Sequence, residues 1–194
     1  MTTPALTRRS TLAGLVLSAA IAPQLAAADD LPGYLIVVGR GTDAAKMGAY
    51  ARTLPPIYAQ TGGYYLSIGA KGRGVQFLKA PWDNRSVVLA RFGSAADVDR
   101  FWWSEAYRAS VRLRDGAGVF SVWKVRADRP TPFEGADAGF LITLLSPSDP
   151  ARADAWARDY AAAVTAAGGV MMAASAPEAM SPLEGDTVFD RVLL

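Results

Sequence analysis

The feature of this sequence that most constrains its fold is an internal repeat, in which the second half restates landmarks of the first. The apolar run Gly33–Val38 returns as Gly139–Leu144, and the glycine pair Gly62-Gly63 returns as Gly168-Gly169. Both matches have the same offset, since 139 − 33 and 168 − 62 each equal 106. Two landmarks in step across an intervening helical stretch seldom match by chance, so we expect two copies of one supersecondary unit.

The N-terminal segment, residues 1–28, has the composition of an export signal. Arg8-Arg9 precede a moderately apolar stretch, which ends before the small residues Ala26–Ala28. Positive charge, an apolar core and a small-residue cleavage site are typical of a secretory signal, and this core is far shorter than the ~18–20 residues of a membrane span. The arginine pair and its surroundings resemble a twin-arginine signal, with an ordinary secretion signal as the alternative. We expect cleavage near Ala28, a periplasmic or secreted protein, and no membrane segment in the mature form.

The residue types that the chain lacks exclude several functions. It has no His and no Cys, which excludes disulfides, thiol catalysis, the Ser-His-Asp triad and most zinc sites. The formal charge of +2 comes from the two arginines of the signal, so cleavage leaves 2 − 2 = 0. Because the mature part has no Lys/Arg-rich run with interleaved aromatic residues, we expect no nucleic-acid partner. We also expect no metal and no cofactor.

The first copy is predicted to follow the order βαββαβ. Tyr34–Val38 is a continuous apolar run, as in a strand that is covered on both faces. In the helical pattern that follows, Pro55-Pro56 predicts a break or kink, and Gly62-Gly63 is a stop signal. The remaining elements are expected at Tyr64–Gly69, Val75–Leu78 and Ser86–Phe92, in helices capped by Ser94 and Ser104, and at Val119–Val125 as a half-buried strand. This order predicts an α+β, ferredoxin-like fold, with two helices on one face of an antiparallel sheet.

The second copy is predicted to be incomplete. It contains a strand at Phe140–Leu145, a helix opened by Pro150, and strands at Val170–Ala174 and Thr187–Leu193. We therefore expect a ferredoxin-like domain over residues 33–126, a linker rich in Pro, Asp and Gly over 127–138, and a truncated second repeat over 139–194. The missing strand predicts an open sheet edge, which the linker, the other repeat or a second molecule must cover.

Three stretches of the first copy resemble a small bacterial family, domain of unknown function 1330. They are Gly62–Leu66, Ser86–Phe92 and Trp102–Tyr107 followed by Leu113-Arg114. The resemblance is good from Gly33 to about Arg126 and weak from Gly139 onward. It implies a dimeric α/β barrel, in which two ferredoxin-like units pair their sheets, and it implies no defined activity. A single chain that carries two copies can approximate this barrel.

Four residues of the first copy are candidates for ligand binding: Tyr64, Trp103, Tyr107 and Arg114. Tyr107 and Arg114 are seven residues apart, close to two helical turns, and therefore share a face. A guanidinium beside aromatic side chains suits a small planar anion such as an aromatic carboxylate. Each candidate also has a structural interpretation. Arg114 can form an ion pair with Asp115 or Glu105, and one of the two indoles Trp102 and Trp103 can pack in the core. The tyrosines can pack in the core or line the barrel; they are Tyr50, Tyr58, Tyr64 and Tyr65.

Two functions from different classes are compatible with these residues. The first is small-molecule binding, or cofactor-independent catalysis with Glu105 or Asp115 as base, in a cavity between sheet and helices. The second is an assembly module whose sheet faces pair with each other or with a partner chain, as in a homodimer. A cavity beside Tyr107 and Arg114 favours the first, and a filled interior favours the second. The glycine-rich loop Gly69–Gly74 lacks the setting of a phosphate-binding loop and is interpreted as a hairpin loop.

Overall fold

The computed structural model describes residues 31–71, 74–75, 85–131, 139–186 and 189–194. The expected export signal at 1–28 lies outside the described residues, as do most of the expected linker and parts of the strands expected at Val75–Leu78 and Thr187–Leu193.

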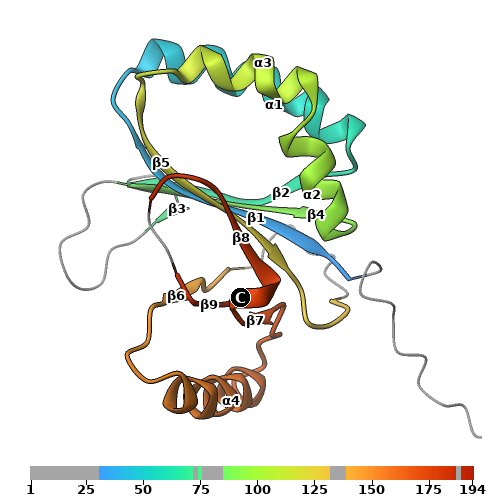
Figure 1. Cartoon of the computed structure of the whole chain (residues 1–194), viewed down its shortest axis with the longest axis vertical. Helices are drawn as coiled ribbons and strands as arrows, with labels where there is room; N and C mark the ends of the chain where they lie inside the picture. Colours follow the sequence, from blue (N-terminus) through green and yellow to red (C-terminus); the bar gives the residue numbers. More distant parts are fainter. Residues whose placement is uncertain (1–30, 72–73, 76–84, 132–138, 187–188) are drawn as a thin grey trace, which may run out of the picture.

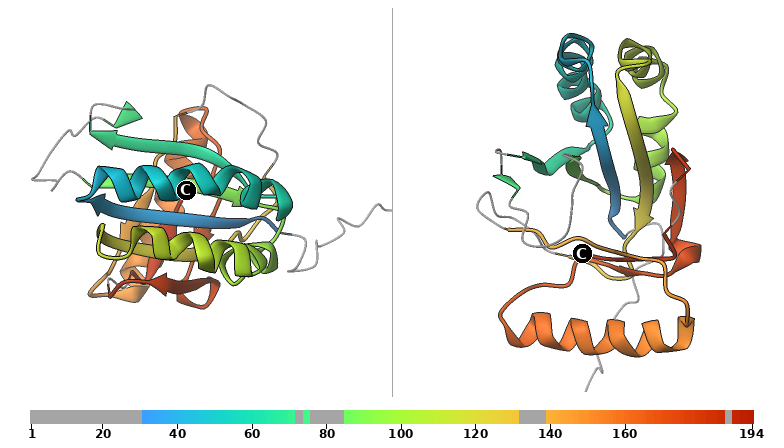
Figure 2. Two further views of the ribbon diagram at one scale, coloured as in Figure 1. Left: turned by 90° about the horizontal axis from the view of Figure 1, so that it is seen from above. Right: turned by 90° about the vertical axis from the view of Figure 1, so that its left-hand side faces the viewer.

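The first half forms an antiparallel sheet with helices on one face, so the α+β prediction is confirmed. Its elements are β1 (Gly33–Gly41), α1 (Ala44–Gln60), β2 (Tyr64–Lys71), β3 (Gly74–Val75), β4 (Ser86–Phe92), α2 (Ala95–Trp102), α3 (Glu105–Val111), the 3-10 turn η2 (Arg112–Arg114) and β5 (Gly118–Arg126). The strand order is β3-β2-β4-β1-β5, continued beyond β5 by β8 (Met180–Glu184) of the second half, and β1 is antiparallel to both β4 and β5. The three helices lie along the same face of this sheet (Figure 1; Figure 2).

The helix starts follow from capping side chains. The Asp43 carboxylate accepts the amide hydrogens of Ala45 and Lys46, each at 3.0 Å, at the start of α1. Ser94 and Ser104 cap α2 and α3 in the same way, as their spacing predicts.

Helix α1 does not break at Pro55-Pro56, so of the two predicted outcomes, a break or a kink, the break is wrong. It continues to Gln60 with both prolines inside it. The carbonyl groups that lose their amide donors belong to Ala51 and Arg52, four residues earlier, and both residues are exposed. Because water can bond these carbonyls, the usual penalty for an internal proline is reduced.

The second half contributes to two sheets. Its elements are β6 (Thr143–Leu145), α4 (Pro150–Ala166), β7 (Ala174–Ser175), the 3-10 turn η3 (Pro177–Ala179), β8 (Met180–Glu184) and β9 (Arg191–Leu193). Three of the strands form a small sheet in the order β6-β9-β7, whereas β8 joins the first sheet beside β5. We did not predict β8, which contains Pro182. Proline lacks the ladder donor and is confined to sheet edges, and β8 occupies an edge.

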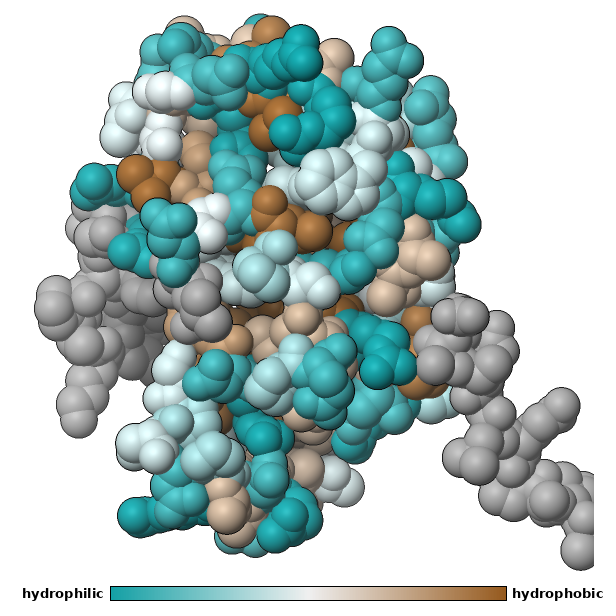
Figure 3. Space-filling view, viewed as in Figure 1, coloured by the Kyte–Doolittle hydropathy of each residue, from teal (hydrophilic) through white to brown (hydrophobic). Residues whose placement is uncertain are grey.

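The six-stranded sheet is covered on both faces, which gives the molecule four layers (Figure 1; Figure 2). Leu35 of β1 packs under the helices, whereas Ile36 faces the small sheet together with Met172 and Val192. Helix α4 forms the outer layer and packs on Met171 and Leu193. Hydrophobic residues accordingly show mainly in the middle of the space-filling view (Figure 3).

The prediction that one face of β5 is exposed to solvent is wrong, because the six-stranded sheet is covered on both faces. Val122 and Trp123 point to opposite faces of β5, and both are buried. The alternation of the sequence shows that the two faces differ, but it cannot show that a second sheet covers the face of Trp123.

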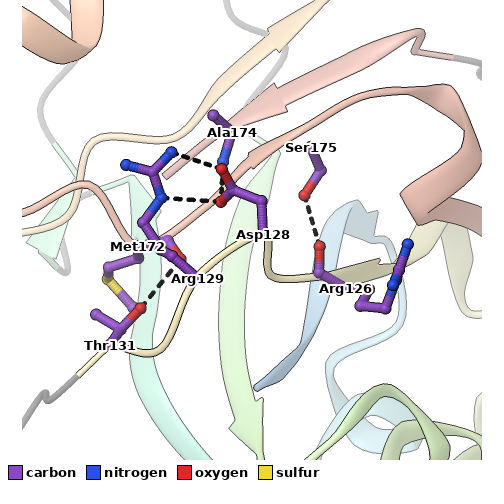
Figure 4. Close-up of polar contacts among 7 residues, drawn as sticks. All are labelled: Arg126, Asp128, Arg129, Thr131, Met172, Ala174 and Ser175. Atoms are coloured by element: carbon purple, nitrogen blue, oxygen red, sulfur yellow. Dashed lines mark hydrogen bonds and ion pairs between the residues drawn. The ribbon is translucent and has the colours of Figure 1, made fainter. Parts of the chain in front are cut away.

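Polar contacts fix the end of β5 and the residues after it to the small sheet (Figure 4). The Ser175 hydroxyl donates to the Arg126 carbonyl at 2.7 Å, and the Asp128 carboxylate accepts the Ala174 amide at 3.0 Å. The buried Thr131 hydroxyl donates to the Met172 carbonyl at 3.1 Å. The start of the expected linker is therefore part of the packed structure.

Candidate functional site

Tyr107 and Arg114 lie together in the interior of the first half. Tyr107 belongs to α3 and Arg114 to η2, and their exposed fractions are 2% and 6%. Both side chains line a cavity of about 90 Å³ between the sheet and the helices. Their seven-residue spacing thus places them on one face, as expected.

We call this space the tyrosine cavity, because tyrosines supply most of its polar groups. Its polar lining residues are Tyr50, Tyr58, Tyr65, Ser86, Tyr107 and Arg114. The hydroxyl groups of Tyr50 and Tyr107 are 3.1 Å apart and form a hydrogen bond. Tyr58 packs between Tyr65 and Phe101, with ring centroids 4.5 and 4.4 Å away. An aromatic wall with a few polar points is the usual character of a small-molecule site.

Three of the cavity tyrosines, Tyr58, Tyr65 and Tyr107, have a raised pKa and stay protonated at physiological pH. Burial raises the pKa of Tyr65 to about 12 and raises the pKa of Tyr107 still further. Burial also holds the pKa of Tyr58 well above its ordinary value. These hydroxyls can therefore donate and accept hydrogen bonds, but they do not supply a base near pH 7.

Arg114 forms a bidentate ion pair with Glu184 of β8. Nη1 and Nη2 donate to the two carboxylate oxygens at 2.7 and 2.5 Å. The guanidinium carbon also lies 4.2 Å from the ring centroid of Phe120 and 5.2 Å from that of Tyr50. Burial is the largest single influence and lowers the pKa of Arg114, but the hydrogen bonds and charge of Glu184, together with the electrostatic effects of Tyr50 and Tyr107, outweigh burial and hold the pKa above its ordinary value.

This pairing corrects the partner that we expected for Arg114. The partner is Glu184, 70 residues further along the chain, rather than Asp115 or Glu105. Local helical spacing suggested the nearer carboxylates. Finding Glu184 requires knowing that β8 lies beside β5, which the proline in β8 conceals from sequence reasoning.

Trp103 and Tyr64 do not reach the tyrosine cavity. Trp103 follows the end of α2 and is 62% exposed, with its ring centroid 5.5 Å from the Arg108 guanidinium carbon. Trp102 is the core ring of the pair, 4.8 Å from the ring of Tyr107. Tyr64 is 47% exposed, because neighbouring residues in a strand point to opposite faces and Tyr65 takes the helical side. The structure thus brings together two of the four candidates.

A second cavity, of about 440 Å³, lies between α4, the small sheet and the six-stranded sheet. We call it the apolar cavity. Its lining includes Leu89 of β4, Val164 of α4, Met171 and Met172, and Tyr160 carries the only polar side chain among the described lining residues. This space suits an apolar ligand but offers few groups that could orient one.

The described residues contain no group of three or more acidic, His or Cys side chains placed to hold a metal ion. Within the same part of the chain, no helix combines the length and apolar content that a membrane span requires.

The first half of the chain is similar to one family model and to several solved structures. The family model described as "Domain of unknown function (DUF1330)" matches residues 32–127. A protein of unknown function from Rhodopseudomonas palustris is similar at 21% identity, over 52% of this chain and 85% of that chain, with a TM-score of 0.42. SnoaB, a cofactor-independent oxygenase from Streptomyces nogalater, is similar at 14% identity, over 54% of this chain and 99% of that chain, with a TM-score of 0.35. No curated protein matches. The family match thus covers the first half of the chain, the part that forms β1 to β5 and the helices over one face of their sheet.

Proposed function

We propose that this protein binds a small aromatic molecule in the tyrosine cavity. The observation that carries the proposal is the hydrogen-bonded hydroxyl pair of the partly buried Tyr50 and the buried Tyr107, whose side chains line unfilled space beside Arg114. Burying hydroxyls and a guanidinium is costly unless each finds partners, and apolar residues would fill the same volume more stably. Polar groups around an internal cavity are therefore better explained by a ligand than by stability.

The size of the cavity sets what can enter. About 90 Å³ is less than the ~150 Å³ of an apolar cavity that accommodates benzene. Met47 of α1 lines the cavity and is only partly buried. Because methionine is unbranched and flexible, we expect it to move aside for a ring of phenol size.

The second half supports a single-chain barrel in this proposal. In the first half β4 pairs with β1 and β2, and in the second half β9 pairs with β6 and β7, all antiparallel. Asp43 caps α1 and Asp149 caps α4, again 149 − 43 = 106 residues apart. We infer that residues 139–194 are a shortened copy that covers the sheet face where related barrels place a second chain. This arrangement weakens the alternative of a homodimer through that face.

Export is a separate proposal that rests on the sequence of residues 1–28. We expect a mature protein that begins near Asp29 and reaches the periplasm or the medium through the twin-arginine route. Replacement of both Arg8 and Arg9 by lysine should abolish export by that route. Continued export of the double-lysine variant through the general secretion route would contradict the assignment.

Methionine NMR can test the binding site directly. The Met47 methyl group reports on the tyrosine cavity, whereas Met171 and Met172 report on the apolar cavity. With ¹³C-methyl methionine, titration with phenol should shift the Met47 signal. Shifts confined to Met171 and Met172 would instead locate binding in the apolar cavity, and no shift would end the proposal.

A matched pair of hydroxyl deletions sharpens the test. Tyr107→Phe removes a cavity hydroxyl, and we expect phenol affinity to fall about five- to tenfold, the equivalent of ~1 kcal/mol for one hydrogen bond. Tyr160→Phe removes the hydroxyl of the apolar cavity and should leave phenol affinity unchanged. Equal effects of the two changes would contradict the assignment.

A further inference from the structure

Glu184 occupies the position in which an anionic ligand would meet Arg114. Its two oxygens accept from Nη1 and Nη2 at 2.7 and 2.5 Å, the fork geometry in which a guanidinium binds any carboxylate. Phe120 and Tyr50 flank the guanidinium carbon on its other sides. The two guanidinium nitrogens of Arg114 that would bind an anionic ligand, Nη1 and Nη2, are therefore already bonded to Glu184.

The backbone holds Glu184 in this position. Val122 of β5 is the residue that pairs with Glu184 of β8, so Glu184 lies at the level of the cavity. Gly185 follows with φ of +83°, and a Cβ there would lie 2.4 Å from the Phe120 carbonyl oxygen. A residue larger than glycine would push β8 away from β5 at this point. The close approach of the chain after Glu184 thus fixes the carboxylate beside Arg114.

The pair removes the net charge of the site. Arg114 contributes one positive charge and Glu184 one negative charge, and burial keeps the phenols of Tyr58, Tyr65 and Tyr107 protonated. A carboxylate ligand would bring a second negative charge next to Glu184, whose side chain is 30% exposed, and two carboxylates that share one site repel each other. An uncharged phenol carries no such penalty and can exchange hydrogen bonds with Tyr50 and Tyr107.

We infer that Glu184 is a specificity-determining residue, which makes the tyrosine cavity selective for uncharged hydroxyl-bearing aromatic molecules and against aromatic carboxylates. This inference rests on the proposed function and reverses the anionic ligand that the sequence suggests for Arg114. The second half of the chain then does more than cover a sheet face, because its strand β8 sets the charge of a site in the first half.

The test compares phenol with benzoate, each titrated into ¹³C-methyl methionine protein while the Met47 signal is followed. The wild-type chain should bind phenol at least tenfold more tightly than benzoate. Glu184→Gln preserves shape and one acceptor oxygen but removes the charge, and it should raise benzoate affinity at least tenfold with little change for phenol. Glu178→Gln removes an exposed carboxylate of η3 and should change neither affinity.

A second variant keeps the inference testable if Glu184→Gln unfolds. Arg114→Met combined with Glu184→Gln removes both charges, and the preference for phenol should persist. The inference is overturned if wild-type protein binds benzoate as tightly as phenol, or if Glu184→Gln leaves the ratio unchanged. If neither phenol nor benzoate shifts the Met47 signal in any variant, the proposed function is wrong, and the inference about Glu184 is wrong as well.

Discussion

The two faces of the six-stranded sheet carry different kinds of space. The helical face has a cavity of about 90 Å³ with several hydroxyls and a buried ion pair. The opposite face, against the small sheet and α4, has a cavity of about 440 Å³ with one polar side chain among its described lining residues. The larger cavity has the volume of a typical ligand site, and the smaller cavity has the polar side chains that could orient a ligand.

This difference shows why volume alone is a weak guide to function. The short strands of the small sheet, such as β7 with two residues, fill less of the space beneath the larger sheet than full-length strands would. Under the proposal that residues 139–194 are a shortened copy, this empty volume follows from the shortening and needs no ligand to explain it. Buried hydroxyls and charges, by contrast, do not arise from incomplete packing, because each carries a desolvation cost.

The largest expected effect concerns the contact between the two sheets. Trp123 is buried against the second half, where its ring lies 4.9 Å from that of Phe189. Trp123→Ala should lower the free energy of unfolding by about 3–5 kcal/mol. Trp103→Ala, at an exposed indole, should change it by less than about 0.5 kcal/mol. Denaturant unfolding measures both, and a larger loss for Trp103 would contradict the assignment of core and surface rings.

The next effect concerns the ion pair on the helical face. Glu184→Ala leaves a buried guanidinium without its carboxylate, which costs ~3–5 kcal/mol for a fully buried pair. The Glu184 side chain is 30% exposed, so we expect a smaller loss, about 2 kcal/mol, because water can reach the site. Glu184→Gln should lose less than Glu184→Ala in the same unfolding measurement. A loss for Glu184→Ala no greater than that for the exposed Glu178→Ala would show that the pair contributes nothing to stability.

The sequence predicted the elements and contacts of the helical face more accurately than those of the opposite face. Capping serines, the glycine pair after α1 and the spacing of Tyr107 and Arg114 are local signals, and local geometry decided each of them. Glu184 escaped because its contact with Arg114 depends on a strand pairing between the halves. Burial of Trp102 was expected from the helical spacing of Val98, Phe101 and Trp102 and is confirmed, whereas Trp103 was selected for its place four residues before Tyr107 and lies exposed just after the end of α2.

Alkaline pH should affect the two faces unequally. Burial raises the pKa of Tyr65 from 10 to about 12 and raises the pKa of Tyr58 further, so these phenols keep their protons in the folded state after the unfolded chain has lost them. The resulting stability is fully present below pH 10 and is lost as pH rises from 10 toward 12. Tyr65→Phe should flatten this decline in an unfolding series across that range. Tyr160→Phe, on α4, should leave the slope unchanged, and equal slopes for the two variants would contradict the prediction.

A smaller effect should follow from enlarging the tyrosine cavity. Met47→Ala removes a flexible, partly buried side chain from its lining. We expect phenol affinity to rise a few-fold, because the ring no longer has to displace Met47. Met171→Ala enlarges the apolar cavity instead and should not alter phenol affinity. Calorimetric titration measures both, and a gain from Met171→Ala alone would move the site to the other face.

The smallest expected effect concerns the junction between the faces, where Asp128 accepts the Ala174 amide at 3.0 Å (Figure 4). Burial raises the pKa of Asp128, but hydrogen bonds from Arg129 and Ala174 outweigh it and leave the pKa below its ordinary value. The stability from this carboxylate is therefore present above pH 3.8 and is lost as pH falls through the lower folded-state value.

Asp128→Asn should cost about 1 kcal/mol or less in the free energy of unfolding, since the side chain is partly exposed. It should also speed hydrogen exchange at the Ala174 amide. Exchange at Leu35 or Ile36, in the central strand, should stay unchanged, because loosening one end of β7 does not open the six-stranded sheet. Uniformly faster exchange across both sheets would show instead that this junction stabilises the whole molecule, and that the two faces are not independent.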